Sequence, residues 1–202
     1  PDSKVYTGGE TINEVETTIK EIQLLVFEEG VYKYRVPGIS ITNFGTTTSF
    51  NARLLASDKM LDLYIVANAT ASVLANEPVI NESEPEVRAK LQLIFSGSGS
   101  FSFLPMFGRY NLASGLQANQ QQEITGISML RAVARIDVLV ANVPGFELTS
   151  VQAYRANERI QLISNQKVST VTEPSIPVNS QTNVNTTAIS VSGNQAVAEL
   201  YL

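Results

Sequence analysis

The chain has 202 residues, 44% of them hydrophobic, which is enough to bury a real core as one large β domain or two small ones. Histidine and cysteine are both absent, so the usual imidazole base, thiolate nucleophile and soft metal ligands are excluded. The formal charge is −5 and the 14 basic residues are scattered along the chain, which argues against nucleic acid as a partner.

The first part of the chain predicts a polar lead followed by a β-hairpin. Residues 1–18 are polar and acidic and are interpreted as an extended lead. Residues 19–27 are predicted as a strand, apolar enough at its centre to be covered on both faces. The sequence Glu-Glu-Gly at 28–30 predicts a three-residue hairpin loop with its glycine in the left-handed conformation. Residues 31–36 then return as the second strand of the hairpin.

Two more strand regions and one helix follow. The Thr-rich residues 40–55 predict a pair of short strands, and residues 60–68 have the pattern of an interior strand. A capping box formed by Ser83 and Glu86, with Pro85 in the first turn, predicts the start of a helix of about three turns. The apolar face of that helix is predicted to consist of Val87, Leu91, Ile94 and Phe95.

The second half of the chain is predicted to be built from strands. Residues 96–100 have the composition of a flexible connector that is too short to separate independent domains. Residues 101–106 are predicted as one strand and residues 124–141 as another, with a long alternation of apolar and polar positions.

The proline and glycine within residues 142–145 end that alternation and predict a domain boundary. We therefore predict an all-β chain with an N-terminal domain over 1–143 and a second β domain over 144–202, whose first strands would be 146–153 and 159–163. A domain of fewer than about 60 residues is marginal alone. The second domain is therefore predicted to be partial, or to be completed by the first domain or by another chain.

The candidate acid and base groups have simple structural explanations. Asp58 and Asp62 are expected to be solvated charges beside the entry to a strand, and Glu82, Glu84 and Glu86 to be helix-start residues rather than paired catalytic carboxylates. The sequence has no calcium-loop pattern, and its Gly/Ser connector lacks the lysine of a phosphate-binding loop. We therefore predict no catalytic, cofactor-binding or metal-binding residue and no enzyme activity.

Two arginines and several tyrosines are candidates for contact with a partner. Arg131 and Arg135 are expected to face the same way, where they would either hold an acidic partner or pair with nearby carboxylates. Tyrosine rings could stack on a sugar, although β-sheets also use tyrosine as a half-buried residue. The tyrosines considered are Tyr6, Tyr32, Tyr34, Tyr110, Tyr154 and Tyr201.

Four stretches of the sequence occur in an informative order. They are EIQLLVFEEGVY at 21–32, the strand at 61–69 that ends in VANA, LPM at 104–106, and LRAVARID at 130–137. Read together, they resemble the Bacteroidales fimbrillin family, which comprises the subunits of type V pili and their anchor and tip proteins. The order and spacing match over residues 19–141, and beyond them the match rests on FELTSV at 146–151 and a late tyrosine.

The resemblance implies two transthyretin-like β-sandwich domains, export to the cell surface as a lipoprotein of the outer membrane or fimbrium, and strand exchange with other pilus subunits. In that family a strand precedes the segment that matches residues 19–27, and its proteolytic removal opens a groove that a neighbouring subunit fills. Because only a polar lead precedes Ile19 here, the chain resembles a processed or trimmed subunit. Membrane attachment would then run only through a lipidated N-terminal segment that is removed or absent.

Strand donation follows from the physics of sheet edges. A sandwich that lacks one strand exposes unpaired backbone groups and an apolar groove, and a strand of another chain satisfies both. We predict that the strands around residues 22–27 and 130–140 border such a groove. Its residues would be Ile22, Leu24, Val26, Leu130, Ala132, Ala134, Ile136 and Val138.

The predicted function is that of a structural or accessory subunit of bacterial surface fimbriae that contributes to cell adhesion. The first alternative is a tip adhesin or a surface glycan-binding lipoprotein module, for which a host protein or glycan would be the partner. The second alternative is an accessory domain of an enzyme whose catalytic domain lies elsewhere.

Overall fold

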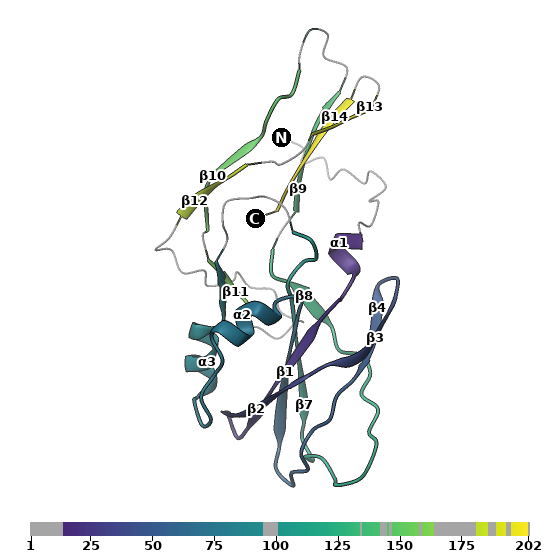
Figure 1. Ribbon diagram of the computed structural model, residues 1–202, viewed down its shortest axis with the longest axis vertical. Coiled ribbons are helices and arrows are strands. Elements are labelled where there is room, and N and C mark those ends of the chain that lie inside the picture. The colour runs from purple at the N-terminus through teal and green to yellow at the C-terminus, as the bar shows by residue number, and fades with distance from the viewer. Residues whose placement is uncertain are drawn as a thin grey trace, which may run out of the picture.

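The regular structure of the described residues consists mainly of β-strands, together with three short helices (Figure 1). This confirms the predicted all-β class. The computed structural model describes residues 14–94, 101–133, 135–141, 145, 147–157, 159–163, 181–185, 189–192 and 195–201.

A five-stranded antiparallel sheet in the order β2-β1-β5-β7-β8 holds most of the buried side chains. Both faces of β1 and β5 are buried, because their nearly continuous apolar runs are covered above and below. The strand bounds are β1 Ile22–Glu28, β2 Val31–Pro37, β5 Leu61–Ala67, β7 Met106–Leu112 and β8 Met129–Arg131.

The turn between β1 and β2 consists of two residues, Glu29 and Gly30. Glu28 still pairs with Val31, and the two turn residues have φ values of 53° and 80°. Positive φ at both central positions is what a type I′ turn requires, and this turn matches the twist of the flanking strands. The predicted hairpin is therefore confirmed, but the predicted three-residue loop is wrong because Glu28 remains in the ladder.

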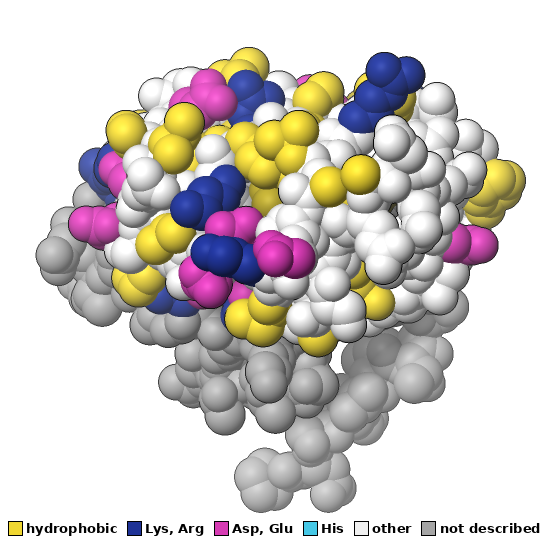
Figure 2. Space-filling model, turned by 90° about the horizontal axis from the view of Figure 1, so that it is seen from below, with side chains coloured by type: hydrophobic (Ala, Val, Ile, Leu, Met, Phe, Trp, Pro, Cys, Tyr) yellow, Lys and Arg dark blue, Asp and Glu magenta, His cyan; other side chains and the backbone are white. Residues whose placement is uncertain are grey.

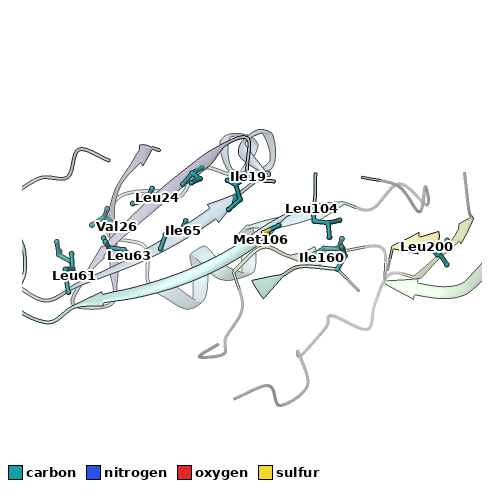
Figure 3. Packing of buried hydrophobic residues seen from close by; sticks show 14 residues of the cluster. Ile19, Leu24, Val26, Leu61, Leu63, Ile65, Leu104, Met106, Ile160 and Leu200 are labelled. Atoms are coloured by element: carbon teal, nitrogen blue, oxygen red, sulfur yellow. The ribbon is translucent and has the colours of Figure 1, made fainter. Parts of the chain in front are cut away.

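A second hairpin, β3 Ile39–Phe44 and β4 Thr47–Asn51, confirms the pair of short strands predicted within residues 40–55. Ile41 and Phe50 of this hairpin pack against one face of the five-stranded sheet. We call the cluster on this face the first core. In Figure 3 it continues beyond the sheet through Ile160 to Leu200, so residues far apart in sequence share it.

Two helices, α2 Thr70–Ala75 and α3 Glu84–Lys90, cover the opposite face of the sheet. Under them the rings of Phe27 and Tyr64 pack edge to face with their centroids 4.7 Å apart. The fully buried helix residues of this second core are Val73 and Val87. The sheet is thus sandwiched between a hairpin on one side and helices on the other.

The predicted capping box of α3 is confirmed, but the helix is shorter than predicted. It ends at Lys90, and Gln92–Ile94 instead form strand β6, which pairs with β11 Arg159–Gln161. The backbone leaves the helix at Leu91, because its carbonyl accepts a hydrogen bond from the N–H of Leu162. Ile94 is exposed rather than part of a helix face, and Phe95 and the connector 96–100 lie outside the described residues.

The single long strand predicted over residues 124–141 is wrong, because the chain changes sheets within it. β8 ends at Arg131 and β9, Arg135–Ala141, begins a second sheet. Directly after β8, the N–H of Ala132 donates a hydrogen bond to the carbonyl of Pro105. Proline has no N–H to continue the ladder, and residues 101–105 form no strand, contrary to the prediction of a strand over 101–106.

The second sheet has the order β13-β14-β9, with β13 Ile189–Ser192 and β14 Gln195–Tyr201. A further pair is formed by β10 Gln152–Asn157 and β12 Gln181–Asn185. The strand predicted at 146–153 is wrong over 147–151, which form no strand. In Figure 1 these strands lie toward one end of the long axis and the five-stranded sheet toward the other.

The end of the polar lead is helical rather than extended. Glu14–Thr17 form one turn, α1, with Val15 packed against the first core. The carbonyl of Val15 accepts a hydrogen bond from the N–H of Leu104, and the side chain of Asn43 binds the backbone of Ile19. Long-range contacts of this kind leave no local signal in the sequence.

Candidate strand-accepting edge

The β2 edge of the five-stranded sheet is partly covered by the loop before α3. The N–H of Tyr32 binds the carbonyl of Glu82, and the carbonyl of Tyr32 accepts from the N–H of Asn81. Val31 also forms a bridge with Ser83. These bonds occupy the groups that an added strand would need at the start of β2.

The opposite edge of the same sheet, β8, is short. Only Met129–Arg131 pair with β7, and the loop before them has no regular structure. Natural proteins protect sheet edges by making the edge strand very short. Among the described residues, the β8 edge is therefore too short to accept a long strand, and the β2 edge is occupied at its start.

β9 offers a longer edge. All seven of its residues pair with β14 on one side, from Arg135 opposite Tyr201 to Ala141 opposite Gln195. On its other side no strand of the described part of the chain pairs with it. An edge of this length carries a row of backbone groups that can bind another strand.

The burial of side chains falls from β14 to β9 across the second sheet. Leu200 is 1% exposed and belongs to the first core, whereas its register partner Ile136 is 42% exposed. In the same way Ala198 is buried while its partner Val138 is only half-buried. Leu139, on the other face of β9, is 51% exposed. Among the residues that the structure describes, the apolar core therefore thins out at β9.

The predicted groove residues that the structure describes are divided between the two sheets. Ile22, Leu24 and Val26 are buried on β1, which has a strand neighbour on both sides and is not an edge. Leu130 and Ala132 are half-buried at and just beyond β8, and Ile136 and Val138 lie on β9. Ala134 lies outside the described residues. A single groove that combines all eight stays a prediction, and Ile136 and Val138 lie on β9, which has a single strand neighbour among the described residues.

A partly buried carboxylate connects the two sheets where the chain passes between them. Glu16 of α1 lies 2.7 Å from the guanidinium of Arg135 and 3.9 Å from that of Arg131, and its backbone carbonyl also accepts from Arg131. Arg135 is shared with Asp137, whose carboxylate lies 2.6 Å away. Of the two roles considered for these arginines, pairing with carboxylates is the one observed. Glu16 was not identified from the sequence, because its partners are far along the chain.

Asp62 is buried rather than solvated, contrary to the prediction. Its carboxylate accepts from Arg109 and from Asn111, with the Asn111 bond at 2.9 Å. The guanidinium of Arg109 also lies over the ring of Tyr64, and burial raises the pKa of that phenol above its ordinary value. These residues fix β5 and β7 beneath α3. The ion pair between Asp62 and Arg109 is therefore a structural contact. Asp58 is exposed and does not take part in it.

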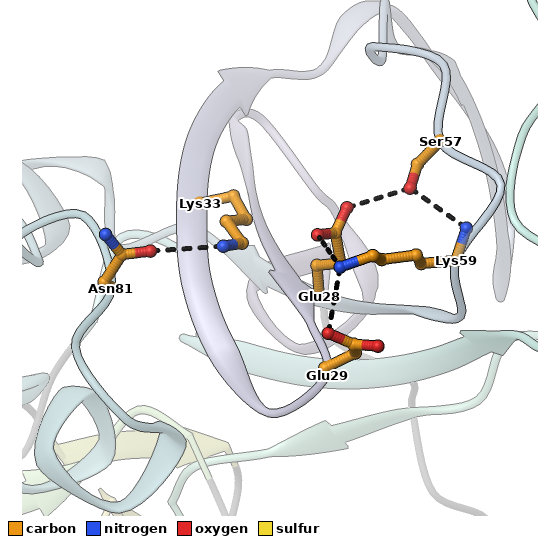
Figure 4. Close-up of polar contacts among 6 residues, drawn as sticks. All are labelled: Glu28, Glu29, Lys33, Ser57, Lys59 and Asn81. Atoms are coloured by element: carbon orange, nitrogen blue, oxygen red, sulfur yellow. Dashed lines mark hydrogen bonds and ion pairs between the residues drawn. The ribbon is translucent and has the colours of Figure 1, made fainter.

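A polar cluster at the β1–β2 turn has the same structural character (Figure 4). Lys59 lies between Glu28 and Glu29, at 3.5 Å and 3.0 Å, and the hydroxyl of Ser57 donates to Glu28. That hydroxyl is the main cause that lowers the pKa of Glu28, and Glu29 raises the pKa of Lys59. Exposed pairs of this kind contribute little to stability. Their effect is to hold the loop before β5 against the turn.

The tyrosines differ widely in exposure. Tyr32 is buried in the second core, where desolvation raises its pKa to about 12. Tyr34 and Tyr110 are half-buried against the first core. Tyr154 on β10 is 72% exposed and presents its ring to solvent. Tyr6 and the side chain of Tyr201 lie outside the described part of the chain.

The described residues include no group of three or more Asp and Glu side chains placed to hold a metal ion. No helix in the described ranges has both the length and the hydrophobicity needed to cross a bilayer. On the face shown in Figure 2, basic and acidic side chains are interspersed with hydrophobic ones, so neither sign of charge forms a broad patch there.

The fold is that of an all-β protein whose second sheet ends at β9 among the residues that the structure describes. No family model matches the sequence, and no curated protein matches it. Solved structures do match over about nine-tenths of the chain. A fimbrial assembly protein from Parabacteroides distasonis superposes with a TM-score of 0.57 at 18% identity, over 90% of this chain and 69% of that one.

Two further structures superpose over 91% of this chain and 64% of their own. The fimbrial anchor protein Mfa2 from Porphyromonas gingivalis gives a TM-score of 0.50 at 10% identity. A protein from Bacteroides thetaiotaomicron, whose description proposes polysaccharide binding, gives 0.54 at 11% identity. The chain therefore has the fold of Bacteroidales fimbrial assembly and anchor proteins, which confirms the predicted resemblance at the level of fold.

Proposed function

We propose that this chain is a structural or accessory subunit of bacterial surface fimbriae, without enzyme activity, that assembles by accepting a strand of another subunit along β9. The observation that carries the proposal is the seven-residue edge of β9, with Ile136 and Leu139 partly exposed on its two faces. The fold shared with fimbrial assembly and anchor proteins supports it. A place at the cell surface and a contribution to adhesion follow from this role.

Strand addition at β9 would gain free energy from two sources. Backbone groups along the outer side of β9 would exchange water for the added strand. Apolar surface on Ile136 and Val138 would also leave water, at roughly 25 cal/mol per Å² buried. Because Leu200 and Ala198 already bury the same face one strand further in, the added strand would extend an existing core rather than begin a new one.

Photo-crosslinking in the native cells tests this proposal. A photoreactive amino acid replaces Leu139 on β9 in one variant and Leu74 on α2 in a matched control, since the two leucines are 51% and 49% exposed. The expected result is a crosslink from position 139 to another fimbrial subunit, with position 74 giving none. Crosslinks to a fimbrial subunit from position 74 alone, or from neither position, would contradict the proposal.

A surface glycan-binding module or tip adhesin is the second candidate, and the exposed ring of Tyr154 favours it. Sugars stack on accessible aromatic faces, and one protein with the same fold is described in terms of polysaccharide binding. A glycan array separates the two candidates. Sugar binding that Tyr154→Ala abolishes would support this second role, and no binding on the array would remove it.

A further inference from the structure

The open edge of β9 carries a charge pattern in addition to its apolar side chains. The side chain of Asp137 is 48% exposed, and the register pairs this residue with Glu199 of β14. Acidic residues thus occupy paired positions in neighbouring strands, an arrangement that is unfavourable when nothing compensates it.

The negative charge of Asp137 is partly neutralised by Arg135, but Arg135 also pairs with a second carboxylate. Its guanidinium lies 2.6 Å from Asp137 through Nε and 2.7 Å from Glu16 through Nη1. Arg131 is also directed to Glu16, with its Nε bound to the Glu16 carbonyl. Both arginines at the passage between the sheets therefore contact Glu16 of α1, and Arg135 divides its positive charge between Glu16 and the partly exposed Asp137.

We propose that the strand accepted by β9 carries a lysine or arginine opposite Asp137, flanked by apolar residues opposite Ile136 and Val138. The inference rests on the proposed strand addition and specifies its partner. Cross-strand neighbours of opposite charge attract and those of like charge repel, so the exposed carboxylate of Asp137 selects a basic residue at the position opposite it. The half-buried face of Ile136 and Val138 selects apolar side chains at the positions on either side.

Two capped peptides that match residues 135–139, the five residues of β9 centred on Asp137, test this inference. One has the sequence Thr-Val-Lys-Val-Thr, which places its lysine opposite Asp137 and its valines opposite Ile136 and Val138, and the other replaces the lysine by glutamate. Each is symmetric, so that either strand direction presents the same pattern. Their affinities for the whole chain are measured by fluorescence anisotropy at low and high salt. The lysine peptide is expected to bind roughly two- to tenfold more tightly, with the difference shrinking as salt is added.

Charge substitutions in the protein locate the effect. Asp137→Lys is expected to reverse the preference and Asp137→Asn to remove it, whereas Asp58→Lys, at an exposed aspartate on another element, should preserve it. The urea midpoint of each variant verifies that it is folded. Equal binding of both peptides, unchanged by Asp137→Lys, would overturn the charge selection and leave strand addition standing. Binding of neither peptide would overturn strand addition at β9, and the charge selection with it.

Discussion

At the scale of single residues, the constraint on Gly115 comes from contacts far away in the sequence. Its φ is +67°, and a Cβ added there would collide with the carbonyl oxygen of Ser57 and lie 2.7 Å from that of Lys59. The same segment is held by paired backbone bonds between Ser57 and Leu116. The carbonyl of Ser57 is part of this bridge and cannot move away without breaking one of its bonds.

We therefore expect Gly115→Ala to lower the free energy of unfolding more than Gly30→Ala does. Gly30 also has a positive φ, of 80°, but open space around its Cα, so alanine there meets only backbone strain of about 1–2 kcal/mol. Alanine at 115 adds the collision, for roughly 1–3 kcal/mol more. Urea unfolding of both variants measures the difference, and equal losses would show that the 115 segment is not held as described.

Sequence reasoning found one of these glycines and not the other for a physical reason. Gly30 lies between two strands that pair with each other, so the local pattern predicts its left-handed conformation. Gly115 is constrained by Ser57 and Lys59, which no local pattern connects to it. The burial of Asp62 was not predicted for the same reason: its partners Arg109 and Asn111 lie on β7, far along the sequence.

At the scale of elements, the start of α3 should make stability depend on pH. Hydrogen bonds from the hydroxyl and the N–H of Ser83 lower the pKa of Glu86. A carboxyl whose pKa is lowered by folding contributes stability above its unfolded pKa, and this contribution is lost as the pH falls through the folded value. In Glu86→Gln the side-chain amide can still accept a hydrogen bond from the N–H of Ser83, but it does not titrate.

Acidification from about pH 6 to about pH 3 is therefore expected to lower the free energy of unfolding less in Glu86→Gln than in the parent chain. Denaturant unfolding at the two pH values measures this. Glu28 and Glu82, whose pKa values are also lowered, titrate in both proteins and provide a common background. A decrease of the same size in both proteins would contradict the assigned role of Glu86.

Elements defined by local patterns were predictable, and those defined by a change of sheet were not. The β1–β2 hairpin, β5 and the start of α3 follow from alternation, turn and capping residues. The break between β8 and β9 does not, because alternation continues through it in the sequence. β8 ends because of its partner strand. β7 begins at Met106, and the preceding residue, Pro105, has no N–H with which to continue the hydrogen bonds between the two strands.

At the scale of the whole molecule, strands from both halves of the chain pair and pack together. β9, which precedes residue 143, pairs with β14, and β11 pairs with β6. Ile160 and Leu200 belong to the first core. The division into domains at 143 and 144 stays a prediction. We propose that both parts share one continuous core, which has its open side at β9.

Hydrogen–deuterium exchange of the whole chain, alone and mixed with fimbriae isolated from its native cells, tests strand addition at β9 most directly. The expected result is that the amides of β9, Arg135–Ala141, gain protection in the mixture. Those of β2, Val31–Pro37, whose edge is partly covered by residues 81–83, should stay unchanged. Protection that appears at β2 or elsewhere while β9 exchanges as it does in the free chain would contradict the account.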